Sequence, residues 1–137
     1  LEQYTPYPYQ LVMVNLAVSL DSACTEVVNE MLFVPKASGA LAPIVLQGES
    51  LHKLKVILND VTLTASDYQL SDNQLVIPVT PADQYQLTIV TETSPENNKA
   101  LSGLYQSSSC LVTQCEAEGF RRITYHPDRP DVLSVYT

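Results

Sequence analysis

Apolar and polar residues alternate along most of the chain, which is the pattern of β-strands that bury one face. The clearest run covers residues 10–20, in which every second residue is apolar: Val12, Val14, Leu16, Val18 and Leu20. The opposite face of this run is mixed in character and comprises Leu11, Met13, Asn15, Ala17 and Ser19. A second run covers residues 25–34 and ends at Pro35, which cannot donate to a ladder. The turn sequence Asp21-Ser22 joins the two runs, so the pattern predicts a β-hairpin.

Six shorter runs predict further strands, at residues 44–46, 53–58, 61–64, 68–70, 74–77 and 85–91. Asn59-Asp60 and Ser71-Asp72-Asn73 are turn sequences between neighbouring runs, so they predict two more hairpins. No segment combines a 3.6-residue apolar period with helix caps. The sequence therefore predicts an all-β fold of six to eight short strands, arranged as a sandwich or a twisted open sheet.

Both ends of the chain bear on its organisation. The alternation resumes at residues 133–137, so we expect a strand that this chain leaves incomplete. Leu1 rather than Met stands first, so we also expect the chain to be a piece of a longer protein. A strand edge left unpaired by such a cut favours self-association of the chain.

Composition and charge exclude several classes of protein. A chain of 137 residues is long enough for one domain with a buried core. The net charge of −8, with seven Lys and Arg in all, excludes nucleic-acid binding, because phosphate contacts need clustered basic residues. No apolar run approaches the roughly 20 residues that span a membrane, so no membrane partner is expected. Three cysteines cannot all pair and no Asn-x-Ser/Thr acceptor occurs, which favours a cytoplasmic location.

The character of the sequence changes between residues 98 and 131, where polar side chains recur at Gln114, Glu116 and Glu118. In a strand these three would share one side, because side chains at i and i+2 point the same way. Three apolar residues of the segment would then pack inward: Cys115, Ala117 and Phe120. Gly119 would permit a sharp bend or a close backbone approach directly after the row.

A row of two carboxylates and one amide suits a cation that carries several N–H donors. The terminal ammonium of a peptide is such a group, since its pKa near 8 keeps it mostly charged at neutral pH. Charge-assisted hydrogen bonds to it contribute roughly 1.5–3 kcal/mol each when water is excluded. The spacing alone favours a plainer interpretation, a solvated strand face with Arg121 and Arg122 pairing nearby.

Other candidate chemistry within the chain is weaker. Cys110 and Cys115 would need two further ligands at suitable spacing to hold zinc, and the sequence does not supply them. His52 and His126 are the two histidines, so no His-Glu-x-x-His motif occurs. A nucleophilic Cys115 with His126 as its base would lack an oriented third group. We therefore expect no metal site and no catalytic residue in this chain, and a structural ion pair for Arg129.

Four motifs near the end of the chain resemble those of the bacterial aminopeptidase N (alanyl aminopeptidase) family. The members of this family are gluzincin-type zinc metallopeptidases. The motifs are Ala-Leu-Ser-Gly-Leu-Tyr (100–105), Thr-Gln-Cys-Glu-Ala-Glu-Gly-Phe-Arg (113–121), Ile-Thr-Tyr (123–125) and Asp-Arg-Pro-Asp-Val-Leu (128–133). The resemblance is long, nearly gap-free and specific over the last forty residues, and is weaker but consistent before them. It implies that residues 1–137 form roughly the first two thirds of a saddle-like, all-β amino-terminal domain, cut on its C-terminal side.

The resemblance also implies a function, the recognition of a peptide's amino terminus for a zinc-dependent aminopeptidase. Glu116 takes the place of the glutamate that binds the peptide α-amine, and Gln114 that of the glutamine lining the first subsite. Glu118 and Arg121 match the motif as well and would have supporting structural roles. The zinc and the catalytic residues would lie in a catalytic domain outside this chain, so the chain alone is expected to be inactive. Its partners would be peptides with a free N-terminus and its own catalytic domain.

Two alternatives stay open at the level of sequence. The chain could be a non-catalytic β-sandwich binding module that carries the same motif. It could also belong to a relative that has lost its zinc ligands and acts as a scaffold. Gly-x-Met-Glu-Asn and His-Glu-x-x-His patterns beyond Thr137 would favour the peptidase.

Overall fold

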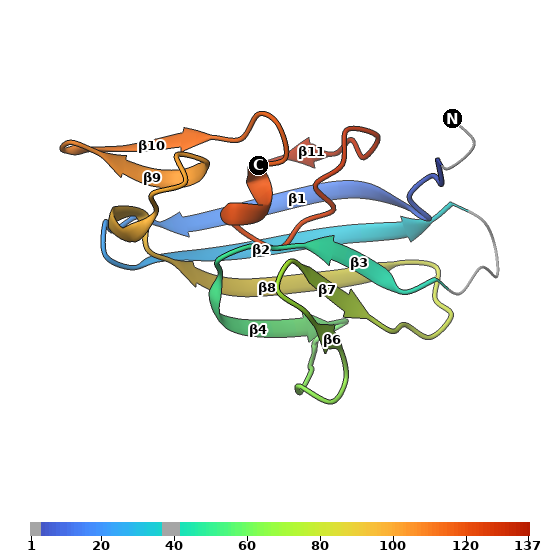
Figure 1. Ribbon diagram of the computed structural model, residues 1–137. Helices are drawn as coiled ribbons and strands as arrows, with labels where there is room; N and C mark the ends of the chain where they lie inside the picture. Colours follow the sequence, from blue (N-terminus) through green and yellow to red (C-terminus); the bar gives the residue numbers. More distant parts are fainter. Residues whose placement is uncertain (1–3, 37–41) are drawn as a thin grey trace.

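The computed structural model describes residues 4–36 and 42–137, which form β-strands joined by turns (Figure 1). The strands are β1 (Tyr9–Ser19), β2 (Thr25–Pro35), β3 (Ile44–Gln47), β4 (His52–Leu58), β5 (Val61–Thr62), β6 (Gln69–Leu70), β7 (Gln74–Ile77), β8 (Tyr85–Thr93), β9 (Gly103–Ser107), β10 (Cys110–Gln114) and β11 (Val135–Tyr136). Two single-turn 3-10 helices, η1 (Pro95–Asn97) and η2 (Phe120–Arg122), complete the described elements. No helix in the part of the chain that the structure describes is long and apolar enough to cross a bilayer.

The all-β prediction is confirmed, with eleven strands in the described residues rather than six to eight. The eight runs expected between residues 10 and 91 all appear as β1 to β8. The two-residue β11 lies within residues 133–137, where the alternation predicts a strand. The additional strands are β9 and β10, which lie where the sequence shows no clear alternation. Hydrogen bonding to each other defines these two strands, so they leave little trace in the apolar pattern.

A six-stranded sheet forms the larger layer, in the order β11-β1-β2-β8-β4-β5. The β1–β2 hairpin is confirmed, with antiparallel pairing that extends from Tyr9–Pro35 to Ser19–Glu26. The β4–β5 hairpin is confirmed as well, and its turn residues Asn59 and Asp60 have φ of 47° and 65°. Two successive residues with positive φ are the signature of a type I′ turn, which matches the twist of the strands it joins.

The apolar alternation of β1 does not mark its buried face correctly. Val14 is completely buried, but Val12 and Val18 on the same predicted face are 36% and 42% exposed. Leu11, on the predicted opposite face, is buried. The pairing with β2 shifts register between Leu11 and Met13, which leaves Val12 as an extra residue in a β-bulge. An extra residue moves the side chains that follow to the other face, so the inward positions are Leu11 before the bulge and Val14 after it.

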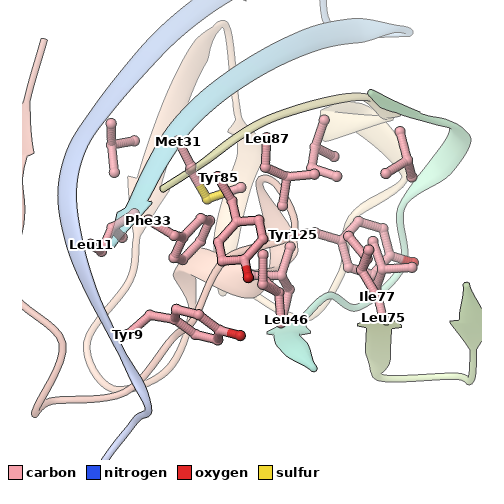
Figure 2. Packing of buried hydrophobic residues seen from close by; sticks show 14 of the residues in the cluster. Tyr9, Leu11, Met31, Phe33, Leu46, Leu75, Ile77, Tyr85, Leu87 and Tyr125 are labelled. Carbon is pink, nitrogen blue, oxygen red and sulfur yellow. The ribbon is translucent and has the colours of Figure 1, made fainter. Parts of the chain in front are cut away.

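The second layer is a three-stranded sheet, in the order β3-β7-β6, which lies against one face of the six-stranded sheet (Figure 1). The side chains between the layers form the main core, which includes Tyr7, Tyr9, Leu11, Val14, Met31, Phe33, Ile44, Leu46, Val56, Leu75, Ile77, Tyr85, Leu87, Ile89 and Tyr125. Figure 2 shows aromatic rings at the centre of this core, where Tyr9 and Tyr85 meet edge to face with centroids 5.7 Å apart. The sandwich expected from the sequence is confirmed.

A smaller cluster attaches the β9–β10 ribbon to the six-stranded sheet. Val27 of β2, Leu104 of β9 and Ile123 are its buried members. Cys115 and Phe120 are half-buried and pack against it. The segment that carries the candidate site therefore begins and ends on residues that are held by the sheet.

Candidate functional site

The candidate site lies in the turn between β10 and η2. β10 ends at Gln114, and residues 116–119 form a turn instead of continuing as a strand. The N–H of Gly119 donates to the Cys115 carbonyl at 2.9 Å, and Glu118 adopts a positive φ of 62°. The strand geometry expected for this row is therefore wrong, because the chain reverses direction at the point where alternation would have to continue.

The three polar side chains of the row consequently have separate surroundings. Gln114, Glu116 and Glu118 are all exposed. The Gln114 side-chain amide donates to the backbone carbonyl of Glu116 at 2.8 Å, so it ties the turn to the end of β10. Among the described residues, no hydrogen bond or ion pair engages the Glu116 carboxylate. The structure thus brings Gln114 and Glu116 together and leaves the Glu116 side chain available to a ligand.

The inward positions predicted for this segment are partly correct. Cys115 and Phe120 pack toward the small cluster, as expected, whereas Ala117 is exposed at the outer side of the turn. Burial raises the pKa of the Cys115 thiol, so this residue lacks the thiolate character of a nucleophile.

Gly119 allows the turn to close. A Cβ atom at this position would lie 2.7 Å from the Gln114 carbonyl oxygen, 2.8 Å from the Cys115 Cα and 2.9 Å from the Ser102 Oγ. These distances are shorter than van der Waals contact, and two of them are to backbone atoms that cannot rotate away. The close backbone approach expected at Gly119 is confirmed.

Arg121 links the turn to the segment that follows η2. Its Nε donates to the Asp128 carboxylate at 2.9 Å, and its guanidinium also lies 3.2 Å from the Glu118 carboxylate. The backbone N–H of Arg121 donates to the same Asp128 oxygen at 3.1 Å. Arg121 thus contacts both Glu118 and Asp128, and the supporting structural roles expected for Glu118 and Arg121 stay predictions.

Asp128 and Gln47 belong to this arrangement, and the sequence assigned neither of them a role, although Asp128 opens the motif at residues 128–133. The Asp128 N–H donates to the side-chain oxygen of Gln47 at 2.9 Å, which connects the segment to β3. Asp128 follows Arg121 by seven residues through an irregular segment, and Gln47 lies 81 residues from Asp128. No strand or helix period relates these positions, so pattern analysis has no signal that could find them.

The other arginines of the segment are paired as well. Arg122 binds Glu49, and Arg129 donates two hydrogen bonds to Asp131 at 2.8 and 2.9 Å. The hydrogen bonds from Arg129 hold the pKa of Asp131 well below its usual range. The plainer interpretation of the sequence, a solvated strand face with Arg121 and Arg122 pairing nearby, is correct for the two arginines and wrong for the strand, because residues 116–119 form a turn. Neither arginine pairs with Glu116.

The described residues do not fit a zinc ion. No group of three or more His, Cys, Asp or Glu residues comes together within ranges 4–36 and 42–137 in a way that could hold a metal. His126 is 4% exposed, shares a hydrogen bond of 2.7 Å with the Tyr136 hydroxyl, and packs edge to face on Phe120. Its Nδ1 has no partner among the described residues. His126 is therefore a core histidine.

Two curated proteins that resemble this chain carry the same name. No protein-family model matches the chain. The chain is 42% identical over all of its 137 residues to Aminopeptidase N of Caulobacter vibrioides, and 42% identical over 134 residues to Aminopeptidase N of Escherichia coli. It spans only 16% and 15% of the length of these two curated relatives.

The fold is shared with solved structures of the same kind. Legionella pneumophila aminopeptidase A, solved with aspartic acid, matches 98% of this chain at a TM-score of 0.86 and 27% identity, and the chain covers 16% of that protein. An M1 zinc metallopeptidase from Deinococcus radiodurans matches 94% of the chain at a TM-score of 0.75 and 12% identity, which supports the fold alone. The two sheets are thus those of an amino-terminal β domain in much longer proteins.

Proposed function

Because this chain is the counterpart of the amino-terminal β domain of the aminopeptidase N family, we propose that it recognises the free amino terminus of peptides for a zinc-dependent aminopeptidase. Residues 1–137 would form part of one amino-terminal domain, and the catalytic domain of the same protein would be their second partner. The described residues offer no zinc site, so the zinc of such an enzyme is assigned to that domain.

The state of the Glu116 carboxylate is the observation that carries this proposal. Its neighbour Glu118 is paired with Arg121, and Asp128, Glu49 and Asp131 are each paired with an arginine. Glu116 is exposed on a turn whose backbone is held by Gln114 and Gly119, and no described residue neutralises it. An unpaired carboxylate suits a ligand that brings its own positive charge.

Gln114 is proposed to line the first subsite beside Glu116. Its recorded hydrogen bond uses the amide nitrogen, so among the described residues the amide oxygen remains available to accept from a ligand N–H group. The two side chains carry three acceptor oxygens in all, which equals the number of N–H donors of a terminal ammonium group.

In this role Glu116 positions the peptide and transfers no proton. When the ammonium group is held at a fixed place, the substrate peptide extends toward the catalytic centre by a fixed length. Only the first peptide bond of the substrate then reaches that centre. The unpaired thiols of Cys24, Cys110 and Cys115 support a reducing cytoplasm as the place where this occurs.

The test is Glu116→Gln in the full-length protein that carries this chain, assayed on an alanyl peptide substrate. We expect kcat/KM to fall by about 10–100-fold, because one ionic hydrogen bond to the substrate is weakened. Glu30→Gln, which neutralises an exposed carboxylate on β2, is the matched control and should keep kcat/KM within about twofold. An unchanged kcat/KM for Glu116→Gln would refute the proposal.

A further inference from the structure

The turn that presents Glu116 has few restraints of its own. Within the turn, the Gly119–Cys115 backbone hydrogen bond and the Gln114–Glu116 bond are short-range contacts. Glu116, Ala117 and Glu118 are exposed, so packing does not fix them. A carboxylate that positions a ligand must itself be held in place, because small displacements weaken a directional hydrogen bond strongly. The contacts within the turn are too few to hold Glu116 in this way.

Asp128 provides an additional restraint on the segment that follows the turn. One oxygen of its carboxylate accepts from both the backbone N–H and the Nε of Arg121, at 3.1 and 2.9 Å. The Asp128 carbonyl accepts a further hydrogen bond from the same guanidinium at 3.1 Å. Three hydrogen bonds between one pair of residues fix Arg121, the second residue of η2, which follows Gly119 by two positions.

Asp128 is itself held by the β-sandwich. Its N–H donates to the side chain of Gln47, the last residue of β3. The backbones of Gln47 and His126 bond to each other in both directions, at 2.8 and 3.0 Å. A continuous path therefore leads from a core strand through Asp128 and Arg121 to the turn.

The exposure of the two ion pairs shows which contact transmits the restraint. The Arg121 and Asp128 side chains are 19% and 14% exposed, so their charge-assisted hydrogen bonds are partly shielded from water. The Glu118 side chain is 62% exposed, so its contact with Arg121 contributes little. The restraint therefore depends on Asp128 far more than on the neighbouring glutamate.

We propose that Asp128 is a positioning residue for substrate recognition, which acts through Arg121 to hold Glu116 in place. This inference rests on the proposed function of Glu116. It differs from a general stabilising role, because it predicts that the effect of Asp128 on the reaction is transmitted by the Glu116 carboxylate.

The experiment is a double-mutant cycle in the full-length protein, with kcat/KM measured on an alanyl peptide for Asp128→Asn, Glu116→Gln and the double variant. Asp128→Asn keeps the shape of the side chain and removes its charge. We expect it to lower kcat/KM about fivefold when Glu116 is present and less than twofold when Glu116 is already Gln. A purely structural residue would cost the same factor in both backgrounds.

Asp131→Asn is the matched control, because it neutralises a comparable arginine partner away from the turn. It should lower the thermal midpoint without a loss of kcat/KM that depends on Glu116. Equal losses for Asp128→Asn in both backgrounds, or no loss beside intact Glu116, would overturn the inference and leave the Glu116 proposal standing. If Glu116→Gln alone has no effect, the proposed function fails, and this inference fails with it.

Discussion

Glu116 and Glu118 are two residues apart in the sequence, yet their carboxylates have different physical roles. Glu118 has a positive φ and turns toward Arg121, where its charge is compensated. Glu116 has no such partner among the described residues. The difference arises because the chain reverses direction between Cys115 and Gly119, which removes the shared face that a strand would have given them. At the scale of single residues, backbone geometry decides which acid is available to a ligand.

The buried His126 makes the free energy of unfolding depend on pH. Burial lowers the pKa of His126 to about 4, compared with about 6.5 for an ordinary histidine. Between these values the unfolded chain takes up a proton that the folded chain does not. The contribution of the neutral His126 to the free energy of unfolding is therefore fully present above about pH 6.5 and is lost as the pH falls toward 4. The loss is up to about 1.4 kcal/mol per pH unit.

We expect urea unfolding between pH 7.5 and 4.5 to show this decline in the free energy of unfolding. His126→Phe should flatten the pH dependence, whatever its effect on absolute stability. His52→Gln is the control, since His52 is exposed and should leave the slope unchanged. An identical slope for wild type and His126→Phe would contradict the assignment.

At the scale of elements, the bulge in β1 decides which of its valines belong to the core. Val12 and Val14 are equivalent in the apolar pattern, being two residues apart on one predicted face. In the structure Val14 is completely buried and Val12 is 36% exposed. The bulge at Val12 accounts for this difference, because an extra residue changes the face to which the following side chains point.

Alanine substitutions test the bulge directly. Val14→Ala should lower the free energy of unfolding by about 2 kcal/mol, because it removes buried methyl groups and leaves a cavity. Val12→Ala, at the exposed residue of the bulge, should change it by less than about 0.5 kcal/mol. Chemical denaturation of the two variants is the measurement, and equal losses would show that both valines are buried.

Sequence patterns predicted these elements well where one face of a strand is buried throughout. In β8, Tyr85, Leu87, Ile89 and Thr91 alternate in the sequence and are all buried in the structure. The pattern failed at Val12, because an inserted residue changes the phase without changing the composition. It also failed after Gln114, where a turn held by Gly119 follows a strand with no break in the polar row.

The candidate site could be predicted only through its motif. Resemblance identified Gln114 and Glu116, and the structure shows that both lie on one turn, although their binding role stays a prediction. Asp128 and Gln47 depend on long-range contacts that no local pattern encodes.

At the scale of the whole molecule, the chain has a core of its own but no metal centre in its described part. The edge strands β5 and β11 have two residues each, which limits pairing with a second copy. Self-association, which we expected from the cut strand, stays a prediction.

The isolated chain should therefore not cleave peptides. We expect no peptidase activity on an alanyl substrate and no stoichiometric zinc after dialysis, because the described residues contain no group that could hold the metal and activate a water molecule. Metal analysis and a peptidase assay on the purified chain are the measurements. One zinc ion per chain, or turnover of the substrate, would contradict the assignment of chemistry to another domain.

The order of the strands in the larger sheet also bears on the kinetics of folding. β2 and β8 are neighbours in the larger sheet, although residues 36–84 lie between them and supply the whole of the three-stranded sheet. The centre of the molecule can form only after that long loop has closed, and loop closure costs entropy before any contact compensates for it. The β1–β2 hairpin, by contrast, needs only local encounters, so it is available early as a template onto which β8 and the rest of the chain can assemble.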